Sequence, residues 1–212
     1  MKYNKKKPLT FIHIPKTGGT SVRTVFEQWY GKENIIHCYS KETITNIQKQ
    51  FLDKGNIVLY GHFNRVNPCI PELNQIVTIL REPLECAISE YYHRKRTNRL
   101  LEDRDTLVKH ICFTKHNTLA DRVTFDININ NYKDVLKKKF LAIGVKEKMH
   151  RTLNLFADVL KKPCLSFEDI PLLNVAPGYD DELSNLTNTH KETFYKNYKL
   201  DKAVYEHVYN EL

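Results

Sequence analysis

The chain has 212 residues, 41% of them hydrophobic, and a formal net charge of +8 at pH 7. This is ordinary for one globular domain, and no run of about 18 apolar residues is present that could cross a membrane. The five cysteines are odd in number and scattered, which favours reduced thiols in a cytoplasmic protein over a disulfide framework. We expect a single domain over residues 1–212, whose basic tip at residues 1–8 lacks the apolar core of a signal peptide.

The positive charge predicts an anionic partner, because a positive field aids the capture of anions. Nucleic acid is a common partner of basic domains, but the sequence has no helix-turn-helix, zinc-finger or aromatic RNP pattern. We therefore expect no nucleic acid. The spacings H-E-x-x-H, the EF-hand loop and Cys-x-x-Cys are also missing from the sequence, so no metal site is predicted.

The first predicted strand runs into a loop with the features of an anion site. Residues 12–21 read I-H-I-P-K-T-G-G-T-S, after an apolar run at 9–14 and before a helix-like pattern at 22–29. A helix N-terminus offers backbone N–H groups and the positive end of its dipole, and glycines let the backbone approach a ligand. The candidate ligands are Lys16, Thr17, Gly18, Gly19, Thr20 and Ser21. The lysine precedes the glycine pair, unlike in the G-x-x-x-x-G-K-[ST] motif.

The next elements predicted are a short strand at 35–38, a helix at 41–52 and a strand at 57–60 that runs into Gly61 and His62. Open α/β sheets bind ligands at the carboxyl ends of their strands. An imidazole there can take a proton from a hydroxyl near neutral pH, so His62 is a candidate base. His13 is the second candidate, and we expect it to pack beneath the first loop.

A second anion-binding segment follows. Residues 76–80 form a nearly continuous apolar run, as in a strand buried on both faces of a parallel sheet. Arg81 then lies at its carboxyl end, and Pro83 suits the first turn of a helix in which Ser89 is about two turns along. A guanidinium can bind a phosphate through two parallel hydrogen bonds. The basic run at residues 93–99 either lines an acceptor groove or complements the C-terminal dipole of this helix.

The rest of the chain continues the alternation of strands and helices. We expect helical pieces near Leu107 and Leu119 that either cover the ligand cleft or shape the acceptor site. A strand is expected at 140–145, with an amphipathic helix after it. Further expectations are a short strand at 163–167, a loop at 174–178 and a last helix with Asp201 as its N-cap. This alternation favours an α/β fold.

Three features together resemble a known family. They are P-K-T-G-G-T-S at residues 15–21, Gly61-His62, and the R-x-P of residues 81–83 followed by Ser89. This order is similar to that of sulfotransferases that use 3′-phosphoadenosine-5′-phosphosulfate (PAPS), in particular the carbohydrate branch with the heparan-sulfate 2-O-sulfotransferases. The resemblance is specific over residues 9–30 and 57–96. It implies a single α/β domain with a P-loop-like, mainly parallel sheet flanked by helices.

The resemblance also implies roles for these residues. The first loop would bind the 5′-phosphosulfate, Arg81 and Ser89 the 3′-phosphate, and His62 would be the catalytic base. Lys16 would stabilise charge on the bridging oxygen as PAP, the 3′,5′-bisphosphate product, leaves. The acceptor would be a hydroxyl, on a carbohydrate that can be acidic, and no metal is required. Glu82 stands where the family often has aspartate, and Glu147 where it has an acidic residue after a strand ending in glycine.

Other interpretations stay open at this point. A P-loop-type nucleotide kinase or hydrolase would prefer ATP with Mg²⁺ over PAPS. A non-catalytic module would bind PAP or a polyanion without transferring sulfate. The loop itself could be an ordinary glycine turn with Thr20 or Ser21 as a helix N-cap.

Overall fold

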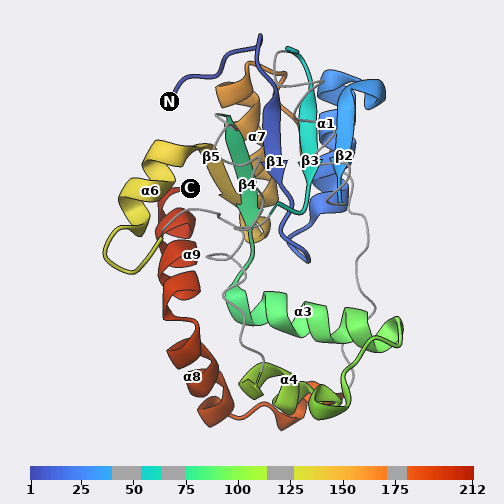
Figure 1. Ribbon diagram of the computed structural model, residues 1–212, viewed down its shortest axis with the longest axis vertical. Helices are drawn as coiled ribbons and strands as arrows, with labels where there is room; N and C mark the ends of the chain where they lie inside the picture. Colours follow the sequence, from blue (N-terminus) through green and yellow to red (C-terminus); the bar gives the residue numbers. More distant parts are fainter. Residues whose placement is uncertain (40–53, 64–74, 114–126, 171–180) are drawn as a thin grey trace.

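The computed structural model describes residues 1–39, 54–63, 75–113, 127–170 and 181–212, and its strands form one parallel sheet in the order β2-β3-β1-β4-β5 (Figure 1). The strands are β1 (Leu9–Ile12), β2 (Ile35–Cys38), β3 (Val58–Gly61), β4 (Ile76–Leu80) and β5 (Phe140–Val145). Every residue of β1, β3 and β4 is buried, as the apolar runs predicted. The predicted α/β class with a parallel sheet is confirmed.

The helices surround this sheet on both faces and beyond its carboxyl edge. They are α1 (Gly19–Tyr30), α3 (Pro83–Arg96), α4 (Leu107–Phe113), α6 (Tyr132–Lys139), α7 (Met149–Leu160), α8 (Asn188–Asn197) and α9 (Lys199–Glu211). Short 3-10 helices are η1 (Lys32–Asn34), η3 (Glu102–Arg104), η4 (Lys146–Lys148) and η5 (Asp181–Asn185). None of the helices in the described ranges is both long and apolar enough to cross a membrane.

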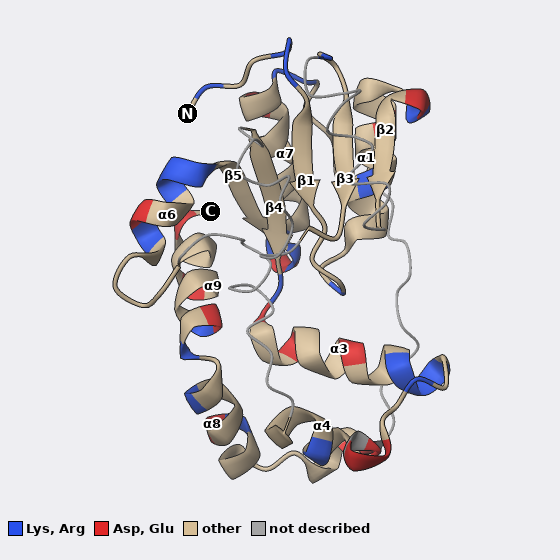
Figure 2. Ribbon diagram, in the orientation of Figure 1, with Lys and Arg blue, Asp and Glu red and all other residues tan. Residues whose placement is uncertain are grey.

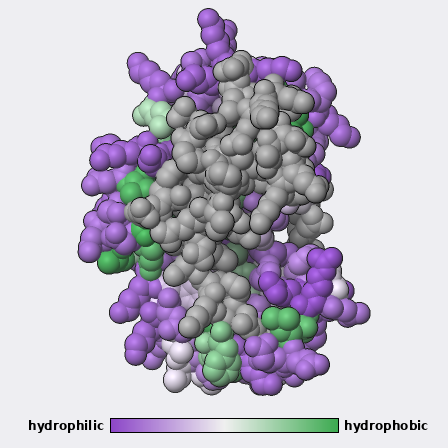
Figure 3. Space-filling view, viewed as in Figure 1, coloured by the Kyte–Doolittle hydropathy of each residue, from purple (hydrophilic) through white to green (hydrophobic). Residues whose placement is uncertain are grey.

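Alternate strand side chains divide the core between the two faces of the sheet. Phe11 and Tyr60 stack with ring centroids 4.5 Å apart and pack with α1 and α7 on one face. Ile12 and Leu59 lie in the cluster of the other face, with buried residues of α6 and α9. This is the period of two that a strand imposes on its side chains. The coloured surface in Figure 3 is correspondingly hydrophilic over most of its area, with small apolar patches.

Helix α3 lies across the carboxyl edge of the sheet, above α4 and α8 in Figure 1. It begins as predicted, with Pro83 at its first position, and the Glu82 carboxylate caps it by accepting the Glu85 N–H at 2.8 Å. Its apolar side chains pack in a third cluster with those of α4 and α8. Helix α3 therefore lies at the edge of the sheet where the sequence predicts a ligand.

Two predicted elements are wrong, and each for a local reason. Residues 163–167 form no strand, because the Asn154 amide of α7 bonds both the N–H and the carbonyl of Leu165, at 2.8 and 3.1 Å. Asp201 is not an N-cap: α9 begins at Lys199 after Tyr198, and Asp201 is buried in its first turn. The predicted helix at 41–52, the helical piece near Leu119 and the loop at 174–178 lie outside the described residues.

Candidate functional site

The β1–α1 loop is a tight turn braced by the side chain of Thr17. Lys16 and Gly18 have left-handed backbones, with φ of 68° and 88°, and Gly18 is the residue from which α1 starts. Thr20 and Ser21 lie inside the first turn of α1, so neither is its N-cap. The Thr17 hydroxyl donates to the carbonyl of Ile14 at 2.8 Å and is buried, so it braces the loop.

Arg81 joins the β4–α3 turn to this loop. Its Nη1 donates to the Lys16 carbonyl at 3.2 Å, and its Nη2 lies 3.4 Å from the Glu85 carboxylate. Arg81 and Ser89 are each only 8% exposed. The bond to the carbonyl stabilises a lysine in a backbone conformation that side chains disfavour. The structure thus brings together the two segments that the sequence treats as separate phosphate sites.

Two arginines and one carboxylate act on Lys16. Burial lowers the pKa of Lys16; the Glu90 carboxylate opposes this, while Arg96 and Arg81 lower the pKa further. Glu90 is already engaged by Arg94 at 2.8 Å, and Glu85 by Arg81. An anion between Lys16 and Arg81 would stabilise both cations, so the chemistry of these side chains fits a phosphate or sulfate.

The basic run at the end of α3 is partly engaged in ion pairs. Lys and Arg gather at this end of the helix in Figure 2, and His93, Arg94, Lys95 and Arg96 occupy its last turn. Lys95 pairs with Glu182 at 2.5 Å, as Arg94 does with Glu90. Such a cluster complements the helix dipole in any case. Its contact with an acceptor stays a prediction.

A cluster of rings occupies the carboxyl ends of β1, β2 and β3. The His62 ring lies 4.9 Å from that of His13 and 4.8 Å, edge to face, from that of Tyr39. His13 Nδ1 is 3.2 Å from the Tyr39 hydroxyl, and the Tyr60 hydroxyl donates to the Gly19 carbonyl at 2.5 Å. The His13 ring lies beside Gly19, the first residue of α1. The sequence analysis did not find Tyr39, which directly follows the predicted strand at 35–38.

Gly19 makes room for His13. A Cβ at position 19 would lie 2.0 Å from His13 Nε2. We expect Gly19→Ala to lower the free energy of unfolding by about 1–3 kcal/mol, since the His13 ring must shift within its cluster. Urea denaturation of the variant in the wild-type and His13→Ala backgrounds measures this. In the His13→Ala background, Gly19→Ala should cost much less free energy of unfolding, because the ring that it displaces is absent. An equal loss in both backgrounds would contradict the steric explanation.

Sequence analysis also missed Lys146, which directly follows β5. Its stem lies beside the loop, with Cγ 3.7 Å from where a Gly18 Cβ would be. Burial lowers the pKa of Lys146, and the Arg81 charge lowers it further. Its position at a strand's carboxyl end was an available signal in the sequence. The Glu147 carboxylate accepts the backbone N–H of Glu82 at 3.0 Å.

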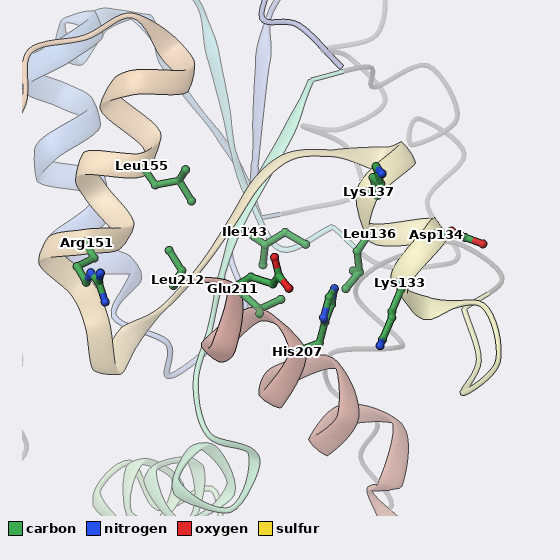
Figure 4. Close-up of a pocket in the computed structure, with 11 residues that line it drawn as sticks. Lys133, Asp134, Leu136, Lys137, Ile143, Arg151, Leu155, His207, Glu211 and Leu212 are labelled. Carbon is green, nitrogen blue, oxygen red and sulfur yellow. The ribbon is translucent and has the colours of Figure 1, made fainter.

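A cavity of about 760 Å³ lies elsewhere, between α6, α7, α9 and β5 (Figure 4). Leu136, Ile143 and Leu155 supply apolar walls, and Lys133 and Glu211 are among its charged lining residues. None of the predicted site residues lines it, so we place the candidate site at the strand ends and not in this cavity. In the described ranges, no three His, Cys, Asp or Glu side chains gather as a metal site requires.

Comparisons with known proteins give a match in structure alone. No family model matches the chain, and no curated protein does. Among solved structures, the fold is similar to that of mouse sulfotransferase SULT7A1 complexed with PAP, with a TM-score of 0.62 at 13% sequence identity. The likeness covers 98% of this chain and 91% of that one. The chain therefore has the sulfotransferase fold.

Proposed function

We propose that the protein is a PAPS-dependent sulfotransferase that transfers the sulfuryl group to a carbohydrate hydroxyl. The observation that carries the proposal is the contact between Arg81 and the Lys16 carbonyl. It joins a loop suited to a 5′-phosphosulfate with a buried guanidinium suited to a 3′-phosphate. The sulfotransferase fold supports the same assignment, and the carbohydrate acceptor rests on the resemblance of the loop sequence.

Each residue of the candidate site would have a separate role in PAPS binding or sulfuryl transfer. Loop amides and α1 hold the 5′-phosphate, while Arg81 and Ser89 hold the 3′-phosphate. His62 takes the proton of the acceptor hydroxyl, whose oxygen then forms a bond to sulfur as the bond from sulfur to the bridging oxygen breaks. Lys16 stabilises the negative charge that this oxygen gains on leaving with PAP. Contact of the acceptor with the basic run at residues 93–99 stays a prediction. The cytoplasmic location also stays a prediction.

Calorimetric titration with PAP and AMP tests the proposal directly. Arg81→Ala should weaken PAP binding by about 10- to 100-fold, since a charge-assisted phosphate contact is lost, and should affect AMP far less. Arg81 also holds the Lys16 carbonyl, so thermal unfolding of the variant without nucleotide is the control for loop damage. Equal wild-type affinity for PAP and AMP would refute the proposal.

The same titration separates the alternatives. A nucleotide kinase or hydrolase would bind ATP with Mg²⁺ more tightly than PAP, yet the order of lysine and glycines in the loop does not favour this class. A non-catalytic module would bind PAP with normal affinity. It would form no PAP from PAPS when acceptors are present, because it transfers no sulfate. A screen of carbohydrate acceptors with PAPS, following PAP release, distinguishes that module from an enzyme.

A further inference from the structure

Lys146 is held in place on three sides. Thr152 of α7 binds both the N–H and the carbonyl of Val145 at 2.9 Å, which fixes the end of β5 just before Lys146. On its other side, Glu147 is bonded to the Glu82 N–H of the β4–α3 turn. The Lys146 stem packs beside Gly18. These contacts fix the backbone of Lys146 and place the start of its side chain beside the β1–α1 loop.

Lys146 is a half-buried cation with a second cation, Arg81, as its strongest charged neighbour. Burial lowers the pKa of Lys146; of the charged groups that act on it, Arg81 has the largest effect and lowers the pKa further, while Glu147, Cys86 and Glu85 raise it. Those carboxylates already bind the Glu82 N–H and Arg81. Within the described ranges, no ion pair or hydrogen bond of the Lys146 ammonium is present. Two cations held near one another at a half-buried position are stabilised by a shared anion.

We propose that Lys146 is a further ligand of the nucleotide's 3′-phosphate and that, with Arg81, it makes the site select PAP over AMP. The inference rests on the proposed function. We assign Lys146 to the 3′-phosphate because Leu80 of β4 pairs with Val145 of β5, so that Arg81 and Lys146 follow neighbouring strand ends, and because Arg81 comes from the turn that leads to Ser89. A dianionic phosphate would match two cations better than one, and the lysine adds a point charge beside the planar guanidinium.

Lys146→Met tests this inference, because methionine keeps an apolar stem against Gly18 and removes only the charge. Calorimetry should show PAP binding weakened by about 10- to 100-fold, with the affinity for AMP unchanged. Lys146→Arg should retain most of the selectivity. The matched control is Lys148→Met in the same turn, since Lys148 is engaged by the Tyr209 carbonyl at 2.6 Å and lies over that ring. This control should bind PAP as the wild type does.

The unfolding temperature (Tm) of Lys146→Met distinguishes a ligand role of Lys146 from a purely structural role, because the two roles predict opposite changes in Tm without nucleotide. Without nucleotide, Lys146→Met should unfold at the wild-type temperature or above it, because a half-buried charge near Arg81 is removed. With PAP, the rise in Tm should be smaller than in the wild type. A packing role predicts instead a lower Tm without nucleotide.

The outcomes separate this inference from the function on which it rests. Unchanged PAP affinity in Lys146→Met, or an equal loss for PAP and AMP, would overturn the role of Lys146 and leave the sulfotransferase proposal standing. A wild-type protein that binds PAP and AMP alike would overturn both. A loss confined to PAP, with the Lys148→Met control intact, supports the assignment.

Discussion

Replacing Lys16 with alanine is expected to lower turnover with PAPS by about 100- to 1,000-fold, the usual cost of removing one preorganised group aimed at developing charge. Lys16 lies in a loop that Arg81 holds by the Lys16 carbonyl, so the backbone that carries the ammonium group is fixed before the substrate arrives. The bridging oxygen gains charge only as the bond to sulfur breaks. The loss should therefore fall on kcat more than on PAP affinity.

Two comparisons separate this role from an effect on folding. Lys161 is exposed and has a similar left-handed backbone, with φ of 56° against 68° for Lys16. Lys161→Ala thus makes the same chemical change in a similar backbone at the far end of α7, and should leave kcat unchanged. Lys16→Arg keeps the charge with a different shape, and should recover only part of the activity. Steady-state rates with PAPS and thermal unfolding of each variant provide the measurements.

The Lys16 assignment fails if Lys16→Ala turns over PAPS at a near-normal rate. It also fails if the variant loses PAP affinity and kcat/KM in equal measure while kcat is retained, because the lysine would then bind substrate and transition state equally. Without nucleotide, the variant should be no less stable than the wild type. Burial disfavours the charged amine, as the lowered pKa of Lys16 indicates.

His62→Ala is expected to lower kcat by about 100- to 10,000-fold, the range over which a positioned general base contributes. His62 directly follows β3, and its backbone N–H donates to the Cys38 carbonyl of β2 at 3.2 Å. The proposed base must be neutral to accept the hydroxyl proton. In the wild type, kcat should therefore rise with pH as the imidazole loses its proton, and the variant should lose this dependence.

Two neighbouring histidines serve as controls. His37 is exposed on β2, the strand paired with β3, and His37→Ala should keep wild-type kcat. His13 is the rival base, with its ring 4.9 Å from that of His62. His13→Asn should lower kcat less than His62→Ala and keep the pH dependence. The reverse result, with the pH dependence lost in His13→Asn, would assign the base to His13. Calorimetry with PAP should show unchanged affinity for His62→Ala.

The fold was largely predictable because its signals are local. Continuous apolar runs identified β3, β4 and β5, and the glycine pair with the apolar pattern after it identified the start of α1. Pro83 marked the start of α3 for a similar reason, since only the first turn of a helix tolerates its missing N–H. The false strand at residues 163–167 arose because a side chain of the preceding helix replaced a strand partner. Asn154 satisfied the backbone of Leu165, and no pattern within residues 163–167 contains that information.

The candidate site was predictable only in part. Lys16, Arg81, Ser89 and His62 were found because each belongs to a short motif or lies beside a strand end. Lys146 and Tyr39 were not, since they carry no motif and gain meaning only from their neighbours in space.

The sequence by itself determined the parallel α/β order, the anion-binding loop and the arginine at a strand end, because each depends on residues a few positions apart. Only the tertiary structure decided that Arg81 holds the Lys16 carbonyl, that His13 and His62 lie together, and that Lys146 joins the same cluster of charge. The physical reason is the parallel sheet. It collects the carboxyl ends of strands far apart in the chain along one edge, and which side chains meet there depends on strand order.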